Sequence, residues 1–242
     1  MARLAREIPI EKIIDRQVEL GQQLHKRIHR QTEPREHPTL SISRETGCGV
    51  DEVIDEINHI LGWQVYNKNI VDRIASDAKL NQKLVESLDE RTRDELKDWI
   101  KAVFQNQVIG SDKYIRHLSE IILSIAKSGK AIIVGRGANF ILPKGQTLNV
   151  RLIAPLQHRI YYMADKLNCG YNQAKNIVVA SDTERQAFLH KFFNNDEFDP
   201  LNYDLIINTG NVTYKTAANI IIKAMCLKFD ITLETLKAPQ TL

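Results

Sequence analysis

The chain has 242 residues and a formal net charge of only +3, from 33 Lys or Arg against 30 Asp or Glu. That balance excludes a protein that coats nucleic acid. The longest apolar runs, such as residues 131–134, are far shorter than the ~18 residues of a membrane helix, and residues 1–7 carry no apolar signal core. Three scattered cysteines form no CxxC pair, which argues against a disulfide framework and a zinc site. We therefore expect a cytoplasmic protein that binds neither nucleic acid nor membranes.

Residues 1–38 differ in pattern from the rest of the chain. Apolar residues recur at a loose helical spacing from Ile10 to Ile28, separated by Lys, Arg and Gln. Two prolines, Pro34 and Pro38, end that pattern. We predict a helical N-terminal extension and linker over residues 1–38, followed by one domain over residues 39–242. The apolar stripe either docks on that domain or binds a partner, which would be another protein or a second copy of the chain.

From residue 39 onward, short apolar runs alternate with longer amphipathic segments. The predicted strands cover residues 40–43, 63–66, 131–134, 148–153 and 203–208. The predicted helices cover residues 50–61, 156–168, 170–192 and 212–229, with nearly continuous helical pattern over 68–128. This alternation predicts an α/β protein with a central parallel sheet and helices on both faces. Ligands of such sheets bind beyond the carboxyl ends of the strands, so we expect the functional residues there.

A loop with two glycines follows the first predicted strand, at residues 44–49. The backbone N–H groups of such a loop, together with the N-terminus of the next helix, can bind phosphate oxygens. Gly47 and Gly49 permit the positive φ angles that this requires. From the loop alone, a tight strand–helix turn without any ligand remains the alternative. Cys48, between the glycines, is either a small filler residue or a thiol made reactive by the helix N-terminus.

Five stretches, in order along the chain, resemble the cytidylate-kinase-like family, a branch of the P-loop nucleoside monophosphate kinases. They are residues 42–52, 62–68, 135–142, 150–155 and 182–208. The resemblance implies a P-loop NTPase-type three-layer α/β/α fold, with a helical acceptor-binding region over residues 67–128 and a lid over residues 170–200. It also implies phosphoryl transfer from ATP, with Mg²⁺, to a pyrimidine nucleoside monophosphate such as CMP or dCMP.

The family's functional positions fall on several residues of this chain. The residues that would wrap the ATP phosphates are Thr46, Gly47, Cys48, Gly49 and Val50. Arg136 matches a basic residue that contacts the monophosphate. Asp182 and Arg185 resemble the acidic and basic pair of the lid, the acid facing the acceptor and the arginine its phosphates, and Arg159 falls near another basic lid-side position. These types suit the chemistry, because arginine binds phosphate oxygens in pairs and neutralises charge on the transferring group.

The loop departs from the standard GxxxxGK[ST] phosphate loop. Arg44 stands at the first glycine and Val50 at the lysine, and two acids, Asp51 and Glu52, follow where the hydroxyl residue is expected. Loss of one well-placed cation typically costs about 10²–10³ in rate. We predict that Arg44 replaces the missing lysine and acts with the two arginines that the resemblance places on the phosphates. No residue is predicted as a metal ligand.

Two other functions fit the same sequence. The missing lysine is also expected of a non-catalytic nucleotide-binding module, whose N-terminal helix would present the nucleotide state to a partner. Alternatively, the chain is a kinase of another small acceptor, because arginines recognise the transferred phosphate rather than a base.

Overall fold

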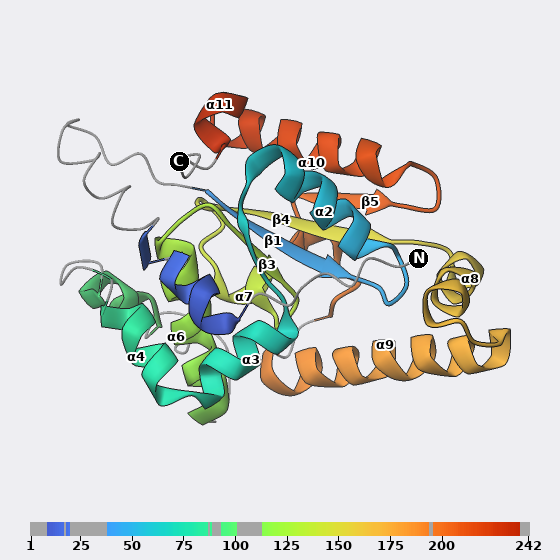
Figure 1. Cartoon of the computed structure of the whole chain (residues 1–242), viewed down its shortest axis with the longest axis horizontal. Coiled ribbons are helices and arrows are strands. Elements are labelled where there is room, and N and C mark those ends of the chain that lie inside the picture. The colour runs from blue at the N-terminus through green and yellow to red at the C-terminus, as the bar shows by residue number, and fades with distance from the viewer. Residues whose placement is uncertain are drawn as a thin grey trace.

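The computed structural model describes residues 9–16, 18–19, 38–86, 88, 93–100, 113–193 and 196–237. Five strands in this part form one parallel sheet with the order β2-β3-β1-β4-β5 (Figure 1). They are β1 (Thr39–Arg44), β2 (Gln64–Tyr66), β3 (Ala131–Val134), β4 (Thr147–Ile153) and β5 (Leu205–Asn208). The predicted α/β fold class with a central parallel sheet is confirmed. Because β1 lies between β3 and β4, its carboxyl end is the natural centre of a binding site.

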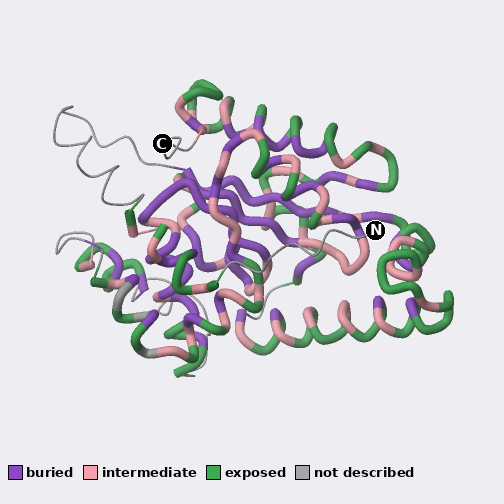
Figure 2. Tube along the Cα trace, viewed as in Figure 1, coloured by how far each residue is buried: buried purple, intermediate pink, exposed green. Residues whose placement is uncertain are grey.

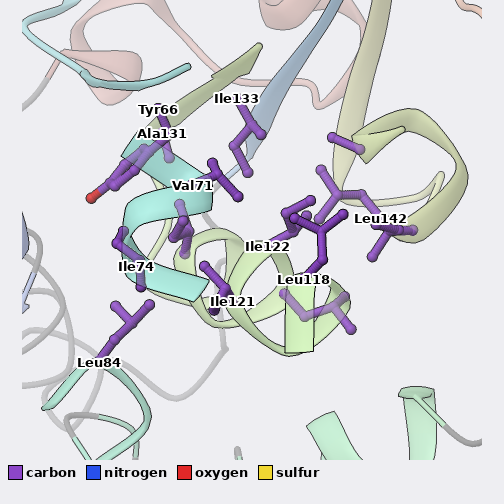
Figure 3. Packing of buried hydrophobic residues seen from close by; sticks show 14 of the residues in the cluster. Tyr66, Val71, Ile74, Leu84, Leu118, Ile121, Ile122, Ala131, Ile133 and Leu142 are labelled. Atoms are coloured by element: carbon purple, nitrogen blue, oxygen red, sulfur yellow. The ribbon is translucent and has the colours of Figure 1, made fainter. Parts of the chain in front are cut away.

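Helices cover both faces of the sheet (Figure 1). One face carries α2 (Val50–Leu61), α10 (Tyr214–Lys228) and α11 (Leu233–Leu236), and the other carries α3 (Lys68–Ser76), α4 (Ala78–Glu86), α6 (Lys113–Lys127) and α7 (Ala138–Ile141). Figure 2 shows the sheet buried between these layers. On the second face, Val71 of α3 and Ile121 and Ile122 of α6 pack with Ile133 of β3 (Figure 3).

The structure explains why the sequence of β3, an interior strand of the sheet, lacks polar alternation. All four of its residues are buried. Ile132 and Val134 belong to the apolar cluster of the α2 and α10 face, whereas Ala131 and Ile133 belong to the cluster of the α3 and α6 face. A strand covered on both sides must be apolar at every position.

Helix α2 begins and ends where the sequence predicts. Gly49 caps its N-terminus with φ 73° and Gly62 caps its C-terminus with φ 67°. Both are left-handed conformations that glycine adopts without a Cβ penalty. Strand β5 is shorter than predicted, because it begins at Leu205. Just before it, the backbone N–H of Asp204 donates to the carbonyl of Asn149 at 2.8 Å, and the carboxylate of Asp204 accepts the N–H of Asn149 at 2.7 Å.

Two helices project beyond the carboxyl ends of the strands. These are α8 (Leu156–Leu167) and α9 (Tyr171–Phe193), which pack on each other through Ile160, Ala174 and Val178. Helix α9 then continues towards α3 and α7 (Figure 1). The short 3-10 helix η1 (Pro200–Asn202) leads from this region into β5.

Parts of the predicted extension and acceptor region also have a described structure. Residues 10–16 form a helix, and its Ile13 and Ile14 are buried in the same apolar cluster as Ile74 and Leu84. Residues 93–100 are helical as well. The rest of the predicted N-terminal extension, residues 1–8, 17 and 20–37, lies outside the described residues, as do residues 87, 89–92 and 101–112 of the predicted acceptor region. Among the helices that are described, none has the length and apolar content needed to span a membrane.

Candidate functional site

The loop between β1 and α2 is packed tightly on its outer side. Gly47 has φ 85° and Gly49 has φ 73°. A Cβ on Gly47 would lie 2.6 Å from the carbonyl oxygen of Arg159, and a Cβ on Gly49 would lie 2.2 Å from the ring of Tyr214. Backbone conformation and close packing therefore both require glycine at these two positions.

Several backbone N–H groups of this loop remain available for a ligand. Within the described part of the chain, no acceptor forms a hydrogen bond with the N–H of Gly47, Gly49 or Val50. The N–H of Thr46, in contrast, donates to Asp182 Oδ1 at 3.0 Å. The loop therefore offers donors at the start of α2, while one of its amides is already engaged by a side chain of α9.

Asp182 is the centre of a charged network between α9 and the loop. Its Oδ1 also accepts from Arg185 Nη1 at 2.9 Å, and its Oδ2 accepts from Arg159 Nη1 at 2.6 Å. Arg185 Nη2 in turn donates to Thr46 Oγ1 at 2.6 Å. Burial alone would raise the pKa of Asp182, but the Thr46 amide and the two guanidinium groups together lower it below its ordinary value.

Arg159 connects the loop to the end of β4. Its Nε donates to the carbonyl of Ala154 at 3.0 Å and lies 3.3 Å from Glu45 Oε2, and its Nη1 donates to the carbonyl of Thr46 at 3.1 Å. Glu45 Oε2 also accepts the N–H of Ala154 at 3.1 Å. The structure thus places Arg159 beside the loop, with its donors directed at protein acceptors.

Arg44 differs from the other arginines of the site. A Cβ on Gly135 would lie 2.4 Å from Arg44 Nη1, so the guanidinium rests on the backbone that follows β3. Burial, followed by the positive charges of Arg185 and Arg136, lowers the pKa of Arg44 to about 10, although the charges of Cys48 and Asp51 act in the opposite direction. No residue that the structure describes forms a hydrogen bond or an ion pair with the Arg44 guanidinium.

The turn after β3 holds Arg136 in a strained conformation. Gly135, Arg136 and Gly137 all have positive φ, of 78°, 54° and 67°, and a non-glycine residue in this region carries a cost of about 1–2 kcal/mol. Arg136 Nη2 pairs with the carboxylate of Asp72 on α3, and its guanidinium lies 4.8 Å from the centre of the Phe188 ring on α9. Its Nε is buried without a hydrogen-bond partner among the described residues.

The three arginines predicted to be catalytic therefore lie in one place. Arg44 comes from β1, Arg136 from the turn after β3 and Arg185 from α9, and the charges of the last two both act on the first. The pair predicted for the lid, Asp182 and Arg185, differs from the expectation in the contacts of the acid. Asp182 binds the loop amide of Thr46, whereas the family resemblance implied that this acid would face the acceptor.

The acids at the start of α2 have partners that sequence reasoning missed. Asp51 Oδ2 accepts from Lys166 Nζ at 2.6 Å, and Glu52 Oε1 accepts from the hydroxyl of Tyr162. Burial alone would lower the pKa of Lys166, but hydrogen bonds with Asp51 and Tyr162 raise it. The only signal in the sequence is that Tyr162 and Lys166 are four residues apart on one predicted helix, and therefore share a face.

Cys48 acts as a filler rather than a reactive thiol. Its side chain is fully buried, and burial, followed by the charge of Glu45, raises its pKa to about 12. Its carbonyl accepts from Thr209 Oγ1 at 2.7 Å, which fixes the loop to the segment after β5. Over the described residues, His, Cys, Asp and Glu form no group of three or more that could hold a metal ion.

Comparison with known families agrees with this geometry. The profile of the cytidylate kinase-like family matches residues 39–211, which is most of the chain and includes the loop after β1, the turn after β3, Arg159, Asp182 and Arg185. The protein belongs to the cytidylate kinase-like family. The resemblance predicted from sequence is confirmed, and with it a nucleotide-kinase-like fold.

Comparison with individual proteins supports the fold but indicates no activity. A protein named uronate isomerase from Corynebacterium glutamicum is 25% identical over 126 residues, which cover 52% of this chain and 24% of that protein. The chain thus spans about a quarter of the length of that curated relative. A solved structure of an uncharacterized protein from Eubacterium ventriosum has a TM-score of 0.62 and 19% identity, and the match covers 78% of this chain and 98% of that one. At this identity the likeness shows a shared fold alone.

Proposed function

We propose that this protein transfers a phosphoryl group from ATP to a pyrimidine nucleoside monophosphate, CMP or dCMP. The observation that carries the proposal is the state of Arg44. Its guanidinium lies close to two other arginines, and no carboxylate in the described part of the chain forms an ion pair with it, although the charge of Asp51 acts on it without direct contact. Gathered like charges in a half-buried place are unfavourable on their own. A polyphosphate, with several negative charges, would turn this repulsion into attraction.

Each part of the site has a role in this reaction. The N–H groups of Gly47, Gly49 and Val50 would bind phosphate oxygens of ATP, and Arg44 would supply the charge that a loop lysine normally supplies. Arg136 would meet the acceptor phosphate, and Arg185 would reach the transferring group from α9. Phosphoryl transfer needs in-line positioning and charge neutralisation rather than covalent help from the protein, and arginines provide both.

Glu52 fits a role in holding Mg²⁺. Its Oε2 is a buried acceptor without a hydrogen-bond partner among the described residues, and it lies in the first turn of α2, next to the loop. Mg²⁺ that accompanies nucleotide phosphates takes only one or two protein carboxylates, the remaining ligands being phosphate oxygens and water. When bound, the ion would neutralise charge on the transferring phosphates.

A second candidate is a non-catalytic nucleotide-binding module. Two observations favour it: the loop has Val50 in place of lysine, and the N–H of Thr46 is engaged by Asp182. Such a module would keep the affinity for nucleotides but not the turnover.

The experiment that separates these functions measures ADP formation from ATP and Mg²⁺ with CMP, dCMP, UMP, AMP and GMP as acceptors. Calorimetry of ATP binding on the same preparation gives affinity independently of turnover. Turnover with CMP or dCMP that exceeds turnover with the purine nucleotides supports the kinase. Binding of ATP without turnover of any acceptor favours the module. A protein that neither binds ATP nor forms ADP contradicts both.

A further inference from the structure

Asp182 occupies donors of the kind that a phosphate would use. Its two carboxylate oxygens accept from a loop N–H, from Arg159 and from Arg185, at distances between 2.6 and 3.0 Å. A backbone amide at a glycine-rich turn and two guanidinium groups form a typical phosphate-binding set. In this structure the anion that fills the set is a side chain of the protein itself, 136 residues from the loop in sequence.

Neighbouring residues of α9 extend this contact across the site. Ser181 Oγ accepts from Thr46 Oγ1 at 2.9 Å, and Glu184 pairs with Lys68 of α3 at 3.2 Å. Further along the helix, Phe188 lies over Arg136. One helix therefore connects the loop after β1, the turn after β3 and the acceptor side, and Asp182 is its anchor on the loop.

We propose that Asp182 is an internal competitor of phosphate, whose carboxylate holds the loop amide and the two arginines until a nucleotide phosphate displaces it. This inference rests on the proposed function, since it assumes that the loop binds polyphosphate. A carboxylate and a phosphate cannot share these donors, because the two anions repel each other at contact distance. Displacement of Asp182 would free the middle of α9 from the loop, so that nucleotide binding and movement of the helix become one event.

The contacts of the two arginines permit the exchange. When Asp182 leaves, Arg159 retains the carbonyl of Ala154 and the carboxylate of Glu45, so it is not left unpaired. Arg185 would exchange the carboxylate of Asp182 for a phosphate oxygen. The packing of α8 on α9 through Ile160, Ala174 and Val178 does not involve Asp182, so the hairpin would stay intact.

The test is a calorimetric titration of the full chain with inorganic tripolyphosphate. Asp182→Asn keeps the shape of the side chain and removes its charge, so the variant should bind tripolyphosphate about 10-fold to 100-fold more tightly than the wild type. Glu184→Gln is the matched control, because it removes the same charge two residues away without touching the loop; its affinity should change by less than about 3-fold.

Hydrogen exchange gives a second readout on the unmodified protein. Saturating tripolyphosphate should increase amide exchange around residues 181–185 of the wild type, since this middle part of α9 loses its contact with the loop. Unchanged exchange in these residues overturns the inference. So does a wild type that binds tripolyphosphate as tightly as Asp182→Asn, or more tightly. The proposed function stands after either result. A wild type and variant that both fail to bind tripolyphosphate overturn the inference and the proposed function together.

Discussion

Two turns at the carboxyl edge of the sheet have similar backbone structure but differ in how their polar groups are paired. The loop after β1 and the turn after β3 each follow a buried central strand, and each contains two glycines with positive φ. In the first, a donor is satisfied by a carboxylate from α9. In the second, Gly135 supports the guanidinium of Arg44, which has no such carboxylate in the described part of the chain.

This difference shows where the site can gain free energy from a ligand. When the donors of a network are already satisfied, a new anion gains little binding free energy, because the first anion must leave before the second can bind. A half-buried cation without a counter-ion gains the full electrostatic interaction when an anion arrives. The turn after β3, together with Arg44, is therefore the place where phosphate binding should be strongest, and the loop after β1 is the place where it should be coupled to α9.

The largest loss of stability is expected from Gly135→Ala. The substitution forces a Cβ to within 2.4 Å of Arg44 Nη1 at a residue with φ 78°, so backbone strain and displacement of Arg44 together should lower the free energy of unfolding by about 2–3 kcal/mol. Urea denaturation measures this value. Gly145→Ala is the control, since a Cβ at that residue would meet nothing within 4 Å and its φ is not positive; equal losses in the two variants would contradict the role assigned to Gly135.

A smaller loss is expected from Asp72→Asn. The carboxylate of Asp72 is the counter-ion of Arg136, whose side chain is only 14% exposed, so its removal should cost about 1–2 kcal/mol of unfolding free energy. Glu184→Gln breaks an exposed pair with Lys68 and should cost less than about 0.5 kcal/mol. Chemical denaturation of both variants separates the two values. An Asp72→Asn variant as stable as Glu184→Gln would show that Arg136 does not need a counter-ion.

The smallest effect is expected from treatment with an alkylating reagent, which should leave Cys48 unmodified. Burial raises its pKa to about 12, so almost no thiolate forms at pH 8 and the loop thiol should stay unmodified by iodoacetamide in the folded protein. Cys169 and Cys226, which are only half-buried, serve as internal controls. Peptide mass spectrometry measures all three, and labelling of Cys48 should rise only as the pH approaches its pKa. Labelling of Cys48 before the other two would restore the reactive-thiol interpretation.

The fold was predictable because its signals are local. The apolar run 131–134 predicts a doubly covered strand, and the glycines at 49 and 62 delimit a helix, without any knowledge of distant residues. Strand β5 was predicted two residues too long, and the side-chain contact just before its first residue joins Asp204 to Asn149, which lies 55 residues earlier. A pattern of apolar spacing contains no information about that contact.

For the site, the sequence predicted which types of residue take part but not how they pair with one another. Arginines placed at strand ends could be assigned to phosphate from the resemblance, but their partners could not. The acid that binds Thr46 comes from a residue 136 positions away, and the counter-ion of Arg136 from one 64 positions away. Which arginine keeps a free charge depends on these long-range pairings, and so the distinction between Arg44 and Arg136 appears only in the folded chain.

The most direct test of the central claim is calorimetric titration of ATP into the wild type and Arg44→Met. Methionine keeps most of the apolar stem of Arg44 and removes the charge. We predict that ATP affinity falls by about 100-fold or more, while the free energy of unfolding without nucleotide rises by about 1 kcal/mol, because burial and the two neighbouring arginines, which lower the pKa of Arg44, make its charge unfavourable in the folded protein. Unchanged ATP affinity in Arg44→Met would contradict the account.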